Sequence, residues 1–249
     1  MTSKRKLRGV ELRGVELRRT GGESAADAAL RGSGGRSRLS PRAVGIVREL
    51  GGRTFEVIGF YNPGRDTKWD AACGSGFLGN FYETPFAFFP PVGQLIEFRN
   101  AEAAFQACKC WSRASDFAAL SGNAAYRLKK QLRNPDFTYG GFGRGNGANW
   151  RAMQAVLAAK FAPGSELACA LLATKSSFLL EHNETAGRDS IWSDNFDGTG
   201  TNWLGAQLML LRERLEVDSV AEPGSWTGFI AASLNLLSGS GGRCARCAS

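Results

Sequence analysis

Residues 98–113, FRNAEAAFQACKCWSR, constrain the fold more than any other part of this 249-residue chain. At 100° per residue, a helix over this segment has apolar or small side chains around most of its circumference. Its polar side chains form one narrow line at spacings i, i+4, i+7 and i+11: Glu102, Gln106, Lys109 and Arg113. A solvated helix face is normally broad and mixed in charge. The pattern therefore predicts a buried helix with one edge opening into a cleft. The alternative is an ion pair between Glu102 and Lys109, bridged by Gln106, on a partly exposed helix.

The positive charge of the chain is concentrated near its N-terminus. The net charge is +8, and residues 1–50 hold 12 Lys and Arg against 5 Asp and Glu. The rest is nearly neutral, so its charge does not require a nucleic-acid surface. Residues 1–50 also lack aromatic side chains, and we expect a disordered basic extension there. This tail could contact nucleic acid weakly or be inert.

Neither a secretory signal nor a membrane span is evident. The basic start lacks an apolar run, and no window approaches the roughly 18 apolar residues of a span. Six scattered cysteines indicate buried free thiols in a reducing compartment: Cys73, Cys108, Cys110, Cys169, Cys244 and Cys247. We therefore expect a cytoplasmic protein with no membrane partner.

Metal-ligating patterns are weak. Cys244 and Cys247 form a lone CxxC, the chain has one histidine, and zinc needs four ligands. Asp194 and Asp197 could hold a cation, but Asp and Gly together also form ordinary turns. We expect no metal site and no cofactor.

Helical patterns are long and strand patterns are scarce in this sequence. They predict a mainly α fold, α+β only at its margins: a single multihelical domain over residues 52–216 with a few short strands. A Gly- and Ser-rich tail over residues 217–249 follows it. The expected strand covers residues 53–60, and the expected helices cover 98–113, 115–121, 123–133, 150–161, 166–173 and 203–216.

Glu102 and Lys109 are the residues that suggest chemistry. A partly buried glutamate with a raised pKa can act as a general acid or base. A desolvated lysine with a lowered pKa can attack an aldehyde-like carbon. Such a pair suits reaction at a sugar anomeric carbon. The single histidine, His182, has no serine in a nucleophile-elbow motif and is either a structural or a substrate-contacting loop residue.

Five blocks of the sequence together resemble one protein family. FLGNFYETPF resembles the FLSNFYPSPF-type motif of the YbiA-like, or NADAR (NAD and ADP-ribose associated), family, and RNAEAAFQACK resembles its S-x-E-H-x-x-Q-x-x-K helix. WRAMQAVLAAKF, LLATKSSFLLEHN and GRDSIWSDNFDGTGTNWLGAQLMLLRERL follow in the family's order and spacing. The resemblance covers about residues 76–215. Ala103, Gly79 and Ser193 depart from the family's usual His, Ser and Gly, which bears on substrate preference.

The resemblance implies a cofactor-independent N-glycosidase that hydrolyses an N-glycosidic bond to ribose. We expect removal of ADP-ribose from ADP-ribosylated guanine bases, as free nucleotide or in nucleic acid. Cleavage of phosphoribosylamino-pyrimidine intermediates of riboflavin synthesis is one alternative, and a non-catalytic ADP-ribose or NAD binding module is another. A structural domain, with the polar line as an ion pair only, is the third.

Site residues follow from the family's motifs and from the polar line. The expected catalytic residues are Glu102 for proton transfer, Lys109 for attack on or stabilisation of the anomeric carbon, and Asp189 as a second acid or base. Lys160 is the alternative amine, and Trp192 could stack on a base. The expected substrate-binding residues are Asn80, Phe81, Tyr82, Gln106, Trp150, Lys160, Trp192, Asn202 and Gly205.

Overall fold

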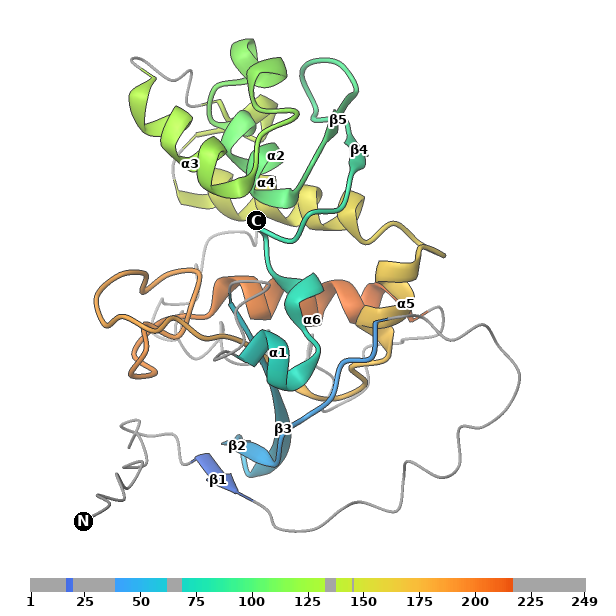
Figure 1. Cartoon of the computed structure of the whole chain (residues 1–249), viewed down its shortest axis with the longest axis vertical. Coiled ribbons are helices and arrows are strands. Elements are labelled where there is room, and N and C mark those ends of the chain that lie inside the picture. The colour runs from blue at the N-terminus through green and yellow to red at the C-terminus, as the bar shows by residue number, and fades with distance from the viewer. Residues whose placement is uncertain (1–16, 20–38, 62–68, 133–137, 145, 217–249) are drawn as a thin grey trace, which may run out of the picture.

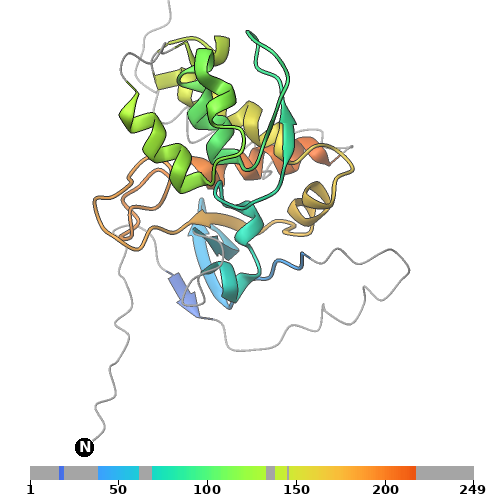
Figure 2. The same ribbon diagram turned by 45° about the horizontal axis from the view of Figure 1, so that its top comes forward.

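The computed structural model describes residues 17–19, 39–61, 69–132, 138–144 and 146–216. A four-stranded sheet lies at the bottom of Figure 1, and helix α6 (Trp203–Leu215) crosses the middle. Above it lie α4 (Asn146–Lys160), α2 (Ala101–Cys108) and α3 (Gly122–Gln131). The view in Figure 2 keeps the sheet and the upper helices on opposite sides of α6. The contacts between elements follow this spatial order: β6 (Phe178–Glu181) contacts α6, α6 contacts α4, α4 contacts α2, and α2 contacts α3.

The larger sheet joins segments that are far apart in the chain. Its order is β1-β2-β3-β6, in which β3 and β6 are parallel and the other pairs antiparallel. Phe60 of β3 is the register partner of Glu181 of β6. Parallel strands end at the same edge of a sheet, so the chain leaves β3 and β6 side by side. The strands are β1 (Leu17–Arg19), β2 (Ile46–Leu50), β3 (Arg53–Phe60) and β6 (Phe178–Glu181).

The mainly α prediction is wrong, because the fold is α+β. Besides the larger sheet, β4 (Phe86–Phe88) and β5 (Ile96–Phe98) form an antiparallel pair. Strand β6 is buried at every position and reads FLLE. A short apolar run of this kind has no alternation to mark it as a strand. Its partner β3 lies more than 100 residues earlier, so no local pattern announces the pairing.

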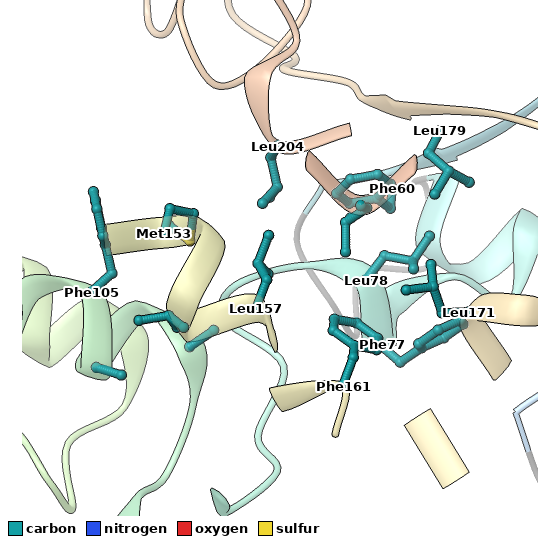
Figure 3. Packing of buried hydrophobic residues seen from close by; sticks show 14 of the residues in the cluster. Phe60, Phe77, Leu78, Phe105, Met153, Leu157, Phe161, Leu171, Leu179 and Leu204 are labelled. Atoms are coloured by element: carbon teal, nitrogen blue, oxygen red, sulfur yellow. The ribbon is translucent and has the colours of Figure 1, made fainter. Parts of the chain in front are cut away.

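Helices supply most of the core above the sheet. Figure 3 shows Leu157 of α4 directed toward Leu204 of α6, and Phe77 beside Phe161. The Phe77 and Phe161 rings meet edge to face at 6.3 Å between centroids. The helices are α1 (Trp69–Cys73), α2 (Ala101–Cys108), α3 (Gly122–Gln131), α4 (Asn146–Lys160), α5 (Glu166–Leu172) and α6 (Trp203–Leu215). The 3₁₀ segments are Gly76–Leu78, Trp111–Asp116 and Tyr139–Gly141.

The central helix α2 is shorter than its sequence pattern predicts. Asn100 caps its N-terminus by accepting a hydrogen bond from the Ala103 N–H at 2.9 Å. The α-helix ends at Cys108, Lys109 is the C-cap, and a 3₁₀ turn follows at Trp111–Asp116. Every residue of α2 is buried. Arg113 leaves the predicted polar line, because it lies in the 3₁₀ turn and pairs with Asp116.

The sheet includes residues that the sequence assigns to the N-terminal extension. Strands β1 and β2 both precede residue 52, and β2 pairs with β3. The remainder of the predicted extension and the 217–249 tail, with Cys244 and Cys247, lie outside the described residues. Of the other cysteines, Cys73, Cys108 and Cys110 are buried free thiols as expected, whereas Cys169 is exposed. No helix within the described ranges is long and apolar enough to cross a membrane.

Candidate active site

A cavity of about 410 Å³ lies where the polar edge of α2 faces the chain that leaves β3 and β6. Such a position is common for ligand sites, because loops at the carboxyl ends of parallel strands enclose a crevice. The lining residues are Tyr61, Asn80, Phe81, Glu102, Phe105, Gln106, Lys109, Asn123, Tyr126, Met153, Glu181, Arg188, Asp189 and Trp192.

Three members of the predicted polar line form one wall of this cavity. Gln106 Nε2 donates to Glu102 Oε1 at 2.6 Å, one helical turn away. The Lys109 ammonium lies 4.2 Å from the centre of the Phe105 ring. Glu102 and Lys109 form no direct ion pair with each other. The alternative interpretation of the polar line is an ion pair between them that Gln106 bridges, and the Gln106 side chain donates to Glu102.

Burial shifts the proton affinities of both charged groups on this wall toward the neutral forms. It raises the pKa of Glu102, although the hydrogen bond from Gln106 and the nearby Lys109 lower it. Burial likewise lowers the pKa of Lys109 to about 8, against the opposing effect of Glu102. A carboxyl group with a raised pKa and an amine with a lowered pKa are suited to exchange protons with a substrate near neutral pH.

The loop after β6 supplies further residues that line the cavity. Asp189 Oδ1 accepts hydrogen bonds from the N–H groups of Ile191 and Trp192, at 3.0 and 2.9 Å, which fixes the D-x-x-W turn. The Trp192 ring meets Phe105 edge to face at 5.3 Å between centroids. The predicted residues Asp189 and Trp192 therefore line the same cavity as Glu102, one with a carboxyl group and the other with a flat aromatic surface.

Glu181 is a cavity carboxyl group that the sequence analysis missed. It is the last residue of β6 and is buried. Burial raises the pKa of Glu181 well above its usual value, and the carboxylates of Asp189, Glu102, Asp194 and Asp70 raise it further. The sequence did contain a signal, because Glu181 is the first charged residue after the apolar run FLL. Side chains at the carboxyl end of a parallel strand often line a ligand site.

Three residues around the cavity have an enclosed polar atom without a hydrogen-bond partner in the described part of the chain: Asn80 Oδ1, Gln106 Oε1 and Glu181 Oε2. A buried polar atom normally has a partner, and leaving one unpaired costs about 1–3 kcal/mol. All three belong to one cavity of small-molecule size, so the arrangement favours a polar ligand as the missing partner.

Comparison with known proteins agrees with this geometry. The sequence model of the NADAR domain matches residues 67–216, more than half of the chain. The chain belongs to the NADAR domain family.

Individual relatives match shorter segments. The N-glycosidase YbiA of Shigella boydii is 41% identical over 75 residues, which cover 28% of this chain and 45% of that protein. A riboflavin biosynthesis protein of Vibrio vulnificus is 36% identical over 87 residues, 31% of this chain and 23% of that protein. The NMR structure of Escherichia coli YbiA aligns with a TM-score of 0.49 and 27% identity, over 67% of this chain and 88% of that one. The chain thus spans less than half the length of the curated relatives it matches.

Five of the predicted substrate-binding residues lie outside the cavity of this NADAR domain: Tyr82, Trp150, Lys160, Asn202 and Gly205. Trp150 meets Trp203 edge to face at 5.2 Å, and Trp203 meets Trp192 at 5.6 Å, so Trp150 supports the aromatic wall from behind. At Gly205, a Cβ atom would lie 2.1 Å from the Leu179 carbonyl oxygen. Glycine therefore lets α6 approach β6 closely.

Other cavity residues were missed because their side-chain directions depend on the tertiary fold. Tyr61 directly follows β3 and reaches the same sheet edge as Glu181. Arg188 lies over the Tyr61 ring at 5.6 Å and adds a second cation. The remaining ones, from α2, α3 and α4, are Phe105, Asn123, Tyr126 and Met153. Within the described residues, no group of three or more His, Cys, Asp or Glu side chains is placed to hold a metal ion.

Lys160 positions the loop that carries Asn80. Its side chain is buried, and Nζ donates to the Gly79 carbonyl oxygen at 2.8 Å. The Asn80 carbonyl oxygen in turn accepts from the Glu102 N–H at 3.0 Å. Burial lowers the pKa of Lys160 to about 7. The Lys160 amine therefore connects the last turn of α4 to the loop from which Asn80 lines the cavity.

We expect wild-type stability to rise, relative to Lys160→Met, as the pH increases from about 7 to about 10. The folded state lowers the pKa of Lys160, so the unfolded chain binds the extra proton in this window. Raising the pH then favours folding by up to about 1.4 kcal/mol per pH unit. Urea unfolding at several pH values measures the difference. Lys130→Met, at an exposed position of α3, is the control. Parallel stability curves for wild type and Lys160→Met would contradict the prediction.

Proposed function

We propose that this chain is an N-glycosidase that hydrolyses an N-glycosidic bond to ribose. The observation that supports it best is that Glu102, Lys109 and Asp189 line the same cavity as the aromatic rings of Trp192 and Phe105. Carboxyl and amine groups can transfer protons and attack an anomeric carbon, and flat rings can stack on a base. The relatives named N-glycosidase YbiA support the same reaction class.

In the proposed reaction, the Lys109 amine attacks the anomeric carbon of ribose. The C–N bond to the base breaks, and its electron pair leaves with the base nitrogen, which takes up a proton. Glu102 accepts the proton that the amine loses. The ribose ring opens to an imine, and water hydrolyses that imine, which releases the sugar with its phosphate groups still attached and the free Lys109 amine. The net reaction adds the elements of water across the C–N bond, so no redox cofactor is required.

Within this class, we prefer ADP-ribosylated guanine as the substrate. Arg188 lines the cavity and is exposed, so it can bind a phosphate group of ADP-ribose while Lys109 reacts at the sugar. The riboflavin alternative is supported by the match to a riboflavin biosynthesis protein, and its phosphoribosylamino-pyrimidine also has a phosphate. The basic N-terminal residues that could contact nucleic acid lie mostly outside the described ranges.

Incubation of the purified chain with each substrate tests this proposal. ADP-ribosyl-guanosine and the phosphoribosylamino-pyrimidine are supplied separately, and release of base and sugar is followed by chromatography. We expect cleavage of at least one, with the higher kcat/KM for ADP-ribosyl-guanosine. Borohydride added during turnover should leave a reduced sugar on the peptide that contains Lys109. Tight binding of ADP-ribose without release of base would instead identify a non-catalytic binding module.

A further inference from the structure

Glu181 stands apart from the other carboxyl groups of the cavity in how it is held. Its backbone is fixed on both sides, because its N–H donates to Asn202 Oδ1 at 2.9 Å and its carbonyl accepts from the Asp194 N–H at 2.9 Å. Its side chain lines the cavity, and Oε2 is enclosed without a partner in the described structure. The fold therefore places a rigidly mounted carboxyl group at the end of β6 and leaves it unpaired.

The groups around Glu181 are mostly acidic. Acidic neighbours come from three parts of the fold: Asp70 from α1, Glu102 from α2, and Asp189 and Asp194 from the loop after β6. Asp194 is bonded to His182 Nδ1 at 2.6 Å, and Lys109 and Arg188 line the same cavity. Neither Lys109 nor Arg188 hydrogen-bonds to the Glu181 side chain, and an unpaired buried carboxylate is costly. These surroundings favour the protonated form of Glu181.

Glu102 is placed differently, although both carboxyl groups are buried. It accepts the hydrogen bond from Gln106 and lies two helical turns from Lys109, and both neighbours oppose the rise in pKa that burial causes at Glu102. Among the described residues, no such neighbour opposes the rise at Glu181. Two carboxyl groups that release their protons with different ease are suited to the acid and the base of one reaction. Glu181 fits the acid and Glu102 the base.

We propose that Glu181 donates the proton to the departing base nitrogen in this cavity, an inference that rests on the N-glycosidase function proposed above. As the C–N bond breaks, its electron pair moves to the base nitrogen, which takes the proton from the Glu181 O–H. Lys109 forms the new bond to the anomeric carbon. When the bond to Lys109 is hydrolysed, Glu102 returns its proton to the Lys109 nitrogen. The Glu181 carboxylate regains a proton from the water whose hydroxyl group ends on the sugar, so the chain is unchanged after a cycle.

Glu181→Gln tests this role because glutamine keeps the size and neutrality of the protonated side chain but has no acidic proton. With ADP-ribosyl-guanosine, we expect kcat to fall by on the order of 10² to 10⁴ while KM changes little. The high-pH limb of the wild-type pH–rate profile that follows loss of the Glu181 proton should vanish. Glu213→Gln, at a buried glutamate of α6 outside the cavity, should retain wild-type rates.

The outcomes separate this inference from the proposed function. An active wild type whose Glu181→Gln variant keeps its rate and pH profile overturns the role of Glu181 alone. A wild type that cleaves neither N-glycoside overturns both. Infrared spectroscopy provides a readout without turnover: the free wild type should show a protonated-carboxyl band at neutral pH that Glu181→Gln lacks. Identical spectra would overturn the inference, whatever the activity.

Discussion

Replacing Glu102 with glutamine should lower the kcat of N-glycoside cleavage by on the order of 10² to 10⁴, the usual contribution of one general acid–base group. Lys109→Met should abolish turnover and the borohydride adduct together, because it removes the only amine proposed to bond the sugar. Neither change should lower the melting temperature. Glu102→Gln removes a buried ionisable group and Lys109→Met a partly buried one, and methionine keeps the apolar contact with Phe105.

The alternative in which Glu102 and Lys109 form a structural pair predicts the opposite combination. Breaking a buried ion pair on one side costs about 3–5 kcal/mol, so either variant would unfold early. Steady-state kinetics and thermal melts on the same preparations distinguish the two cases. Glu97→Gln and Lys130→Met, at exposed positions outside the cavity, control for the loss of one charge. Wild-type turnover in both test variants would remove α2 from the mechanism.

The pH dependence of borohydride trapping distinguishes a catalytic role of Lys109 from a structural one. The pKa of Lys109 is lowered to about 8, so the fraction of neutral amine rises as the pH approaches that value. Adduct formation should increase over the same range. Glu102 opposes this lowering, so Glu102→Gln should shift the rise toward lower pH. A profile unchanged by Glu102→Gln would show that the two groups do not interact.

The polar edge of α2 could be predicted from sequence because its spacing is local. Glu102, Gln106 and Lys109 share one helix face at i, i+4 and i+7, and all three line the cavity. Arg113 did not follow, because the α-helix stops at Cys108 and the chain turns into a 3₁₀ segment. A helix end inside an apolar, Ala- and Cys-rich segment without glycine or proline leaves no local mark.

The sheet and its carboxyl group could not be predicted in the same way. Glu181 reaches the cavity because β6 pairs with β3, which is separated from it by most of the domain. Lys160 shows the converse limit: its position near the apolar face of α4 was compatible with a cavity amine. The structure instead directs it to the Gly79 carbonyl oxygen. Which buried face of a helix meets a ligand depends on packing partners that periodicity does not identify.

Asn202 gives the second large expected effect, and it concerns stability. Sequence resemblance suggested a ligand contact, but both ends of its side chain bind the backbone of β6. Oδ1 accepts from the Glu181 N–H and Nδ2 donates to the Leu179 carbonyl oxygen, each at 2.9 Å. Asn202 also adopts a left-handed backbone, φ 51°, which asparagine tolerates better than most residues. It fastens the start of α6 to the strand that carries Glu181.

We expect Asn202→Ala to lower the free energy of unfolding by about 2–6 kcal/mol, since it leaves two buried backbone groups unpaired at about 1–3 kcal/mol each. Urea unfolding should show a lower midpoint at unchanged slope.

Asn123→Ala is the matched control, because Asn123 lines the cavity from α3 and is exposed. Its loss should raise KM and leave the midpoint unchanged. The reverse pattern, with Asn202→Ala stable and weak only in substrate binding, would make Asn202 a ligand contact. Asn202 holds the Glu181 backbone. The Asn202→Ala variant should therefore also show a lower kcat under conditions in which it is still folded, which links the stability of this sheet edge to the proposed proton donor.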